Sequence, residues 1–184
     1  DEVMDEQRKS IYSWRQAIVE RKGVGEELKR LIAATARDAV DLYVPNAKAD
    51  ASEWDLAGLS EWFERKFDSK IDIPQSLIGQ FEELEALVVE QGEKAYDQLC
   101  EQYGTEVVET IGRIILLEII DGKWKDHLHA MDVLRSGIGL RGYAQVDPKI
   151  EYKREALDMF EDMFFSVTEE VTNRLFRVQI EADT

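Results

Sequence analysis

Two long amphipathic helices joined by a short glycine-rich segment constrain the fold of this chain more than any other feature. Apolar residues recur at steps of three and four along Val107–Leu134 and again along Tyr152–Val178, which is the spacing of a buried stripe on a helix. The segment between the two runs contains Gly137, Gly139 and Gly142. Because helices joined by so short a connection must fold back on each other, the sequence predicts an antiparallel helical hairpin.

The remaining sequence also favours helices. The chain has only 3 Pro and 11 Gly in 184 residues, and strong helix formers such as Ala, Leu, Glu and Lys dominate between them. No run alternates β-branched and polar residues between turn signals, as a strand would. We therefore predict an all-α fold with three parts: a long helix over residues 1–45, a small helical subdomain over 46–104, and the two-helix hairpin over 105–184.

The first part is expected to be either one long helix or two collinear helices. Apolar residues recur at helical spacing from Met4 onward, and Pro45 is expected to end the helical pattern. Gly23 and Gly25 lie inside it, and each costs about 1 kcal/mol in a helix interior. A break at these glycines is therefore one alternative and a continuous helix is the other.

The middle part reads as short amphipathic helices separated by loops. Helical periodicity predicts one helix over residues 56–67 and another over residues 82–103. Gly104 is placed as a helix stop, and Thr105 is placed as the N-cap of the hairpin's first helix. These signals separate the subdomain from the hairpin.

Composition bounds the function. A formal net charge of -16 repels phosphates, so a nucleic acid partner is not expected. Residues 122–154 differ, because they carry seven basic and four acidic residues. This mildly basic patch is either a functional surface or a chance distribution of surface charges.

The single cysteine, Cys100, allows no intramolecular disulfide and fits a reducing compartment. No apolar run is long enough to span a bilayer. The chain starts without Met and is expected to be a piece of a longer protein.

Motifs for catalysis, nucleotides and metals fail on inspection. Residues 137–142 match the letters GxGxxG, but a helix rather than a strand precedes them, so they are interpreted as a helix end. No phosphate-binding loop is present. His127 and His129 point to opposite sides of a helix and cannot share a metal; we expect ordinary surface or hydrogen-bonding roles for both. We expect no enzyme activity, cofactor or metal in this chain alone.

Five aromatic residues stand out. We expect four of them to pack within the fold, as large anchors usually do: Trp14, Trp54, Trp62 and Trp124. Tyr143 lies in the connecting segment, off both apolar stripes. It either grips an extended polypeptide by its ring and hydroxyl or folds back onto the end of the hairpin, and both alternatives stay open.

Two stretches carry a family resemblance. WKDHLHAMDVLRSGIGLRGYAQVDPKIEYKREALDMFEDM, over residues 124–163, and DEVMDEQRKSIYSWR, over residues 1–15, resemble the C-terminal helical region of the SecA preprotein translocase ATPases. The resemblance implies that residues 1–45 are a scaffold helix, 46–104 a helical wing domain, and 105–184 a two-helix finger that completes the scaffold. It also implies that the motor domains, with their ATP and magnesium, lie in other parts of the full-length protein.

The resemblance further implies a site and partners. The tip of the finger would contact a SecYEG-like channel and the unfolded preprotein, and it would help to regulate the motor domains of the same polypeptide. The residues that map onto this tip are Arg141, Gly142, Tyr143, Ala144 and Gln145. Such a module would be cytoplasmic and peripherally associated with the inner face of the bacterial plasma membrane. The alternatives left open are a stand-alone acidic helical adaptor and self-association of the chain.

Overall fold

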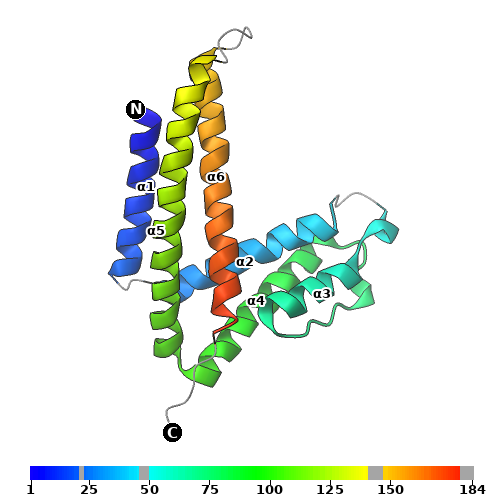
Figure 1. Ribbon diagram of the computed structural model, residues 1–184. Coiled ribbons are helices and arrows are strands. Elements are labelled where there is room, and N and C mark those ends of the chain that lie inside the picture. Colours follow the sequence, from blue (N-terminus) through cyan, green and yellow to red (C-terminus); the bar gives the residue numbers. More distant parts are fainter. Residues whose placement is uncertain (21–22, 46–49, 141–146, 179–184) are drawn as a thin grey trace. The chain divides into compact units, whose positions relative to one another are not determined.

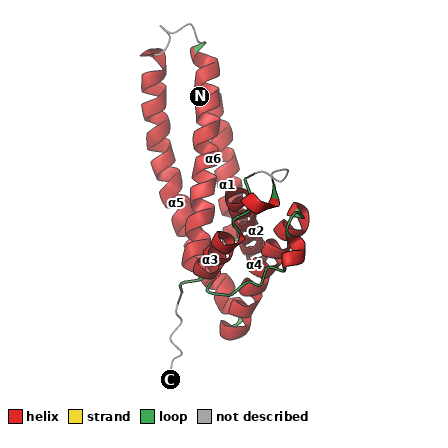
Figure 2. Cartoon of the chain, turned by 90° about the vertical axis from the view of Figure 1, so that its right-hand side faces the viewer, coloured by secondary structure: helices red, strands yellow, loops and turns green. Residues whose placement is uncertain are grey.

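The computed structural model describes residues 1–20, 23–45, 50–140 and 147–178. Over these residues the protein has six α-helices, short 3-10 turns and no strand, which confirms the all-α fold (Figure 1 and Figure 2). The elements are α1 Glu2–Val19, α2 Val24–Tyr43, η1 Ala51–Glu53, α3 Leu56–Phe67, η2 Gln75–Leu77, α4 Phe81–Tyr103, α5 Thr105–Ile138 and α6 Pro148–Leu175.

The chain divides into two compact units. Unit 1 consists of Asp1–Gly23 and Arg113–Glu170, and unit 2 consists of Val24–Gly112 and Val171–Thr184. Unit 1 thus holds α1 with most of α5 and α6, whereas unit 2 holds α2, α3 and α4. The first division falls after Gly23 rather than after residue 45, so the compact units do not coincide with the ranges expected for scaffold, wing and finger. That three-part assignment stays a prediction.

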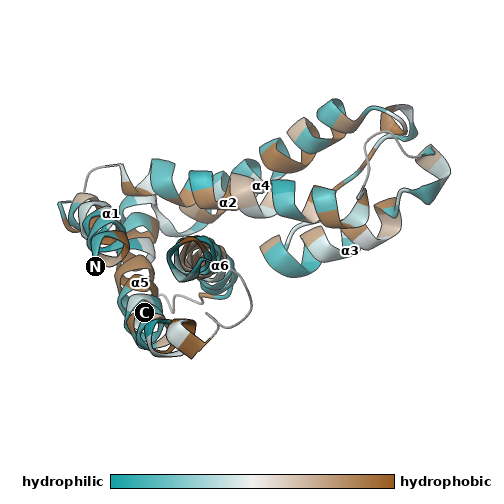
Figure 3. Ribbon diagram, turned by 90° about the horizontal axis from the view of Figure 1, so that it is seen from above, coloured by the Kyte–Doolittle hydropathy of each residue, from teal (hydrophilic) through white to brown (hydrophobic). Residues whose placement is uncertain are grey.

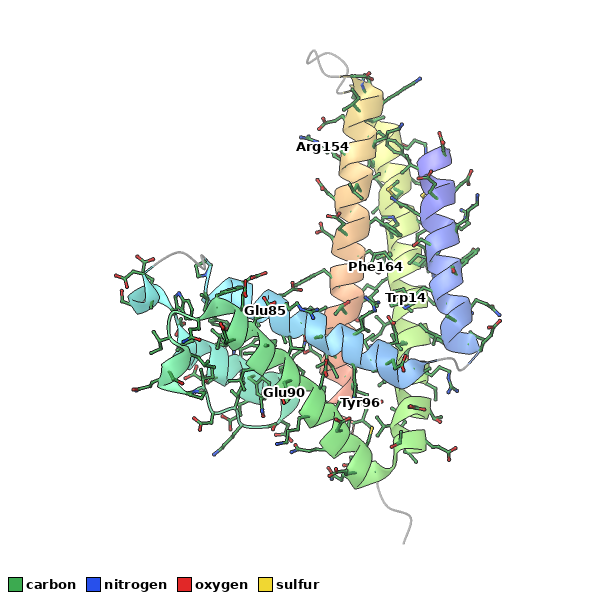
Figure 4. The ribbon with its side chains drawn as sticks, turned by 180° about the vertical axis from the view of Figure 1, so that it is seen from behind. Trp14, Glu85, Glu90, Tyr96, Arg154 and Phe164 are labelled. Carbon is green, nitrogen blue, oxygen red and sulfur yellow. The ribbon has the colours of Figure 1, made fainter. Side chains whose placement is uncertain are left out.

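Unit 1 is a three-helix arrangement. The expected hairpin is present, because Lys123 of α5 pairs with Glu170 of α6 at 2.9 Å and the rings of His127 and Phe160 pack closer to the connected ends, with centroids 5.6 Å apart. In this unit α1 lies beside both helices, antiparallel to α5 and parallel to α6 (Figure 1 and Figure 4). Arg15 of α1 makes a two-pronged ion pair with Asp121 of α5, at 2.8 and 3.0 Å.

The core of unit 1 follows the predicted apolar stripes. Trp124 is only 7% exposed, and Trp14 packs on Phe164 with ring centroids 5.3 Å apart (Figure 4). The burial of Trp124 and the ring contact of Trp14 agree with the packing role expected for both. The other buried apolar side chains are Met4, Ile11, Ile18, Ile115, Leu116, Ile119, Ile120, Met131, Leu134, Ala156, Met163 and Val167.

Unit 2 is built by α2, α3 and α4, whose helices carry apolar residues on their packed faces and hydrophilic residues outside (Figure 3). Gly92 lets α4 approach α2, because a Cβ at this position would lie 3.0 Å from the Cγ2 atom of Ile32. Phe67 contacts three aromatic rings, those of Trp62, Phe63 and Phe176. The largest buried aliphatic and aromatic side chains of this core include Leu28, Leu31, Ile32, Val40, Leu59, Phe63, Leu84 and Val88.

Two glycines set helix boundaries. Gly23 has a φ of +63°, α1 ends at Val19 and α2 begins at Val24, so the continuous-helix alternative is wrong and the break is confirmed. Gly104 has a φ of +94°, and its N–H donates to the carbonyl of Cys100 at 2.8 Å, as the predicted stop requires. Its own carbonyl accepts the first hydrogen bond of α5, so Gly104 takes the N-cap position and the prediction of Thr105 was one residue late.

Candidate functional site: the connected end of the α5–α6 hairpin

The residues predicted to form the tip lie outside the described residues. They are Arg141, Gly142, Tyr143, Ala144 and Gln145, and we refer to them as the fingertip. The structure does describe both flanks, which are the end of α5 with the two residues after it, up to Leu140, and the start of α6 with the preceding Asp147. These two flanks form the base that carries the fingertip.

The start of α6 is fixed by its own first residues. The carboxylate of Asp147 accepts a hydrogen bond from the N–H of Lys149 at 2.9 Å, and its carbonyl accepts one from the N–H of Glu151 at 3.1 Å. Pro148 occupies the first helical position, where a missing N–H costs nothing. An Asp-Pro pair at a helix start also complements the positive end of the helix dipole, so α6 begins at a defined residue.

A single carboxylate joins all three helices at this end of unit 1. Asp1 caps α1 by accepting from the N–H of Val3 at 3.1 Å. Its other oxygen lies 3.4 Å from Nη2 of Arg135 on α5 and accepts a hydrogen bond from the hydroxyl of Tyr152 on α6. We call this arrangement of Asp1, Arg135 and Tyr152 the Asp1 contact.

A shallow cleft of about 420 Å³ opens beside the Asp1 contact. Its walls are mostly apolar, with charged groups at the rim. The cleft is lined by Asp1, Arg135, Ile138, Pro148, Lys149 and Tyr152. A concave apolar surface with a few charges at its edge is suited to hold an apolar side chain of another polypeptide.

Large apolar side chains toward the connected end of the hairpin are exposed. Leu140 is 78% exposed, Ile150 is 65% exposed and Val133 is 62% exposed. The first turns of α6 also carry the basic residues Lys149, Lys153 and Arg154, and Arg154 pairs with Glu151 one turn earlier. Exposed apolar side chains at the end of a hairpin that also carries basic residues favour an interaction surface there.

A buried polar contact supports the hairpin below this end. His127 of α5 and Gln7 of α1 are 5% and 6% exposed, and their Nε2 and Oε1 atoms are 2.7 Å apart. The Nε2 atom of Gln7 donates to the carbonyl of Ala156 on α6 at 3.1 Å. Gln7 therefore turns its oxygen toward the imidazole, and His127 must donate from Nε2. We call this the Gln7 contact.

Burial also sets the protonation of two groups. Loss of water around His127 lowers its pKa from 6.5, so the ring is neutral at pH 7. In unit 2, burial raises the pKa of the Cys100 thiol, which keeps it protonated and makes it a poor nucleophile. Among the described residues, no three His, Cys, Asp or Glu side chains are placed to hold a metal ion.

Sequence reasoning found one of these features and missed two. It gave His127 an ordinary surface or hydrogen-bonding role without naming a partner, and the partner is Gln7, 120 residues away. It did not single out Asp1 or Tyr152. An aspartate before a helix signals an N-cap, but no local pattern could show that the same carboxylate reaches two other helices.

Comparison with known proteins agrees with this architecture. The family model of the SecA Wing and Scaffold domain matches residues 1–179. The chain belongs to this family. It is 38% identical to the protein translocase subunit SecA of Desulforamulus reducens, with 99% of the chain and 21% of that protein covered. The corresponding SecA of Geotalea uraniireducens is 37% identical over 98% of the chain, and that of Thermodesulfovibrio yellowstonii is 34% identical over 100% of it.

The SecA Wing and Scaffold chain spans about a fifth of the length of these relatives. The match extends over both compact units, because it includes α1 through α6. Within the described ranges, no helix combines the length and the apolar composition needed to cross a membrane.

Proposed function

We propose that this SecA Wing and Scaffold chain is a non-catalytic mechanical module of an ATP-driven bacterial protein export motor, and that its fingertip contacts the translocating preprotein. The observation that carries the proposal is the connected end of the hairpin, where Leu140 and Ile150 are exposed among basic side chains on a chain of net charge -16. Exposed apolar residues with nearby hydrogen-bonding groups suit an unfolded polypeptide, which presents both kinds of group.

The geometry suits a lever. α5 has 34 residues, so it is about 50 Å long at 1.5 Å per residue. Within unit 1 it is supported by α1 on one side through the Arg15–Asp121 pair and by α6 through the Lys123–Glu170 pair. Packed helices resist bending, so a displacement applied along the hairpin would reach its tip.

The partners follow from this role. The fingertip would act at the mouth of a SecYEG-like channel, where an unfolded preprotein enters. Motor domains elsewhere in the full-length protein would bind ATP and magnesium and supply the energy of hydrolysis, and the hairpin would help to restrain their ATPase. Such a protein would work in the cytoplasm, peripherally bound to the inner face of the plasma membrane.

A second candidate is an acidic adaptor that binds a basic partner. One observation favours it: residues 24–112, the larger part of unit 2, carry 20 acidic and 8 basic residues. Acidic surfaces steer basic partners toward them. This role predicts binding that depends on unit 2 and weakens with salt, whereas the export role depends on the fingertip of unit 1.

The decisive experiment is site-specific cross-linking. A photoreactive residue replaces Tyr143 in a chimaera, in which this chain replaces the matching segment of the Desulforamulus reducens SecA, and a preprotein is stalled during transport. We expect an adduct with the preprotein from position 143. The matched control places the same group at Ile114, an exposed α5 residue. Strong adducts from position 114 with none from 143 would refute the proposed role of the fingertip.

A further inference from the structure

We infer that α1 is the positioning element of the fingertip, because it fixes the axial register of α5 against α6 through the Asp1 and Gln7 contacts. The effect on where the fingertip contacts a preprotein rests on the proposed function. The register of the helices is a property of unit 1 alone. Asp1 and Gln7 are positioning residues in this scheme, since both act through other side chains and neither lies in the fingertip.

The Asp1 contact fixes register at the connected end of the hairpin. Arg135 of α5 and Tyr152 of α6 meet the same carboxylate oxygen, and each lies within one or two helical turns of the fingertip. Asp1 is held in turn by the backbone N–H groups of its own helix. Neither limb of the hairpin can slide along α1 without losing its charge-assisted bond to Asp1.

The Gln7 contact fixes the same register deeper in the unit. A slide of one helical turn, about 5.4 Å, would separate the imidazole of His127 from the carboxamide of Gln7. Both groups are buried, and buried polar groups that lose their partners are costly. If the helices slid by one turn, the apolar side chains on either side of this contact would still meet other apolar side chains. The polar contact would be lost, so it distinguishes between registers that the apolar stripes would accept equally.

The register is constant along α1. Each α6 partner lies 149 to 151 positions after its α1 partner, at Asp1–Tyr152, at Gln7–Ala156 and at Trp14–Phe164. The last of these pairs is aromatic and adjoins the Arg15–Asp121 ion pair with α5. α1 thus holds both limbs at three levels, and the base of the fingertip cannot shift along the hairpin axis unless α1 moves or these contacts break.

The register can be measured in this chain by pulsed spin-label distances. Labels are attached after Val133→Cys and Phe165→Cys, two exposed positions on α5 and α6, in a Cys100→Ser background. Gln7→Leu removes the buried hydrogen bonds of the Gln7 contact, and Tyr152→Phe removes the hydroxyl that binds Asp1.

In the parent chain we expect a single narrow distance between the labels. In the Gln7→Leu Tyr152→Phe double variant we expect a broader distribution, with a second population displaced by about one helical turn. Ile11→Val is the control, because it truncates a core side chain of the same helix and keeps the Asp1 and Gln7 contacts. It should leave one narrow distance.

The consequence for the fingertip is read in the chimaera by cross-linking from position 143. We expect the Gln7→Leu Tyr152→Phe variant to spread the adducts over more preprotein positions and to lower the yield at the original position severalfold, with Ile11→Val unchanged. Unaltered distances and adducts in the double variant would overturn the inference. If the double variant fails to fold, Tyr152→Phe alone is tested in the same way. Absence of any adduct in the parent would refute the proposed function, while the spin-label distances would still decide the register.

Discussion

His127 of α5 donates a hydrogen bond to Gln7 of α1 across 2.7 Å inside unit 1, with both side chains almost fully buried. The amide of Gln7 is oriented by its donation to the carbonyl of Ala156, which leaves only its oxygen for the imidazole. A neutral ring with its proton on Nε2 satisfies this arrangement, and its Nδ1 atom needs no proton. The pair therefore links the protonation of one residue to the packing of three helices.

This pair predicts a pH-dependent stability. Burial lowers the pKa of His127 in the folded chain below its ordinary 6.5. The unfolded chain therefore binds a proton first as the pH falls, and the free energy of unfolding decreases from about pH 6.5 down to the folded pKa. Above pH 6.5 this contribution is fully present. Urea unfolding should therefore give a lower free energy of unfolding at about pH 5.5 than at about pH 7.5. In the His127→Gln variant the difference between the two pH values should be smaller.

A matched control is available on the same helix. His129 is exposed and makes no contact with Gln7, so His129→Gln should retain the loss of stability at lower pH. Equal pH dependence in the His127→Gln variant and the parent would contradict the assignment of this behaviour to the buried ring.

Adjacent isoleucines on α5 test the packing of unit 1. Ile115 is 8% exposed, whereas Ile114 is 59% exposed. Ile115→Asp places a carboxylate in the apolar core, which should lower the free energy of unfolding by several kcal/mol. Ile114→Asp should change it by less than about 0.5 kcal/mol, as surface substitutions usually do. Thermal unfolding followed by circular dichroism compares the two, and equal melting temperatures would contradict the described burial.

Two glycines should respond to alanine with opposite signs. Gly104 has a φ of +94°, which strains any side chain, so Gly104→Ala should destabilise by about 1–2 kcal/mol. Gly122 lies inside α5, and a Cβ added there would meet no other group within 4 Å, so Gly122→Ala should stabilise by about 0.5–1 kcal/mol through helix propensity. Chemical denaturation of both variants gives the signs. A stabilising Gly104→Ala would show that this turn relaxes without strain.

Local patterns predicted the helices well, because the signals for a helix and its ends lie in residues that are close together in the sequence. The spacing of apolar residues gave α3 at its observed bounds, and Gly104 gave the junction between α4 and α5. The choice between one helix and two at Gly23 stayed open, because propensity alone costs about 1 kcal/mol per glycine and packing decides the outcome.

The long-range contacts at the candidate site could not be predicted in the same way. Tyr152 and Asp1 are 151 positions apart, and neither belongs to a motif that names the other. The division after Gly23 depends likewise on which helices share a core. Family resemblance, by contrast, supplies the prediction of the fingertip residues, because it needs only the order of the residues and not their contacts, and that assignment stays a prediction.

The fingertip prediction concerns Tyr143, which lies outside the described residues. If its ring serves an external polypeptide, Tyr143→Ala should change the free energy of unfolding of this chain by no more than about 0.5 kcal/mol. The same substitution in the chimaera should lower preprotein transport strongly, because the ring supplies contact area that Ala lacks.

Tyr143→Phe and Tyr12→Ala complete the test of the fingertip. Tyr143→Phe keeps the ring, so transport should recover in part if apolar contact dominates and should stay low if the hydroxyl is needed. Tyr12 is an exposed tyrosine on α1, and Tyr12→Ala should leave transport unchanged. A loss of stability well above 0.5 kcal/mol in Tyr143→Ala would instead mean that this ring folds back onto the hairpin. Reduced transport would then follow from a damaged hairpin and would not demonstrate a contact with the preprotein.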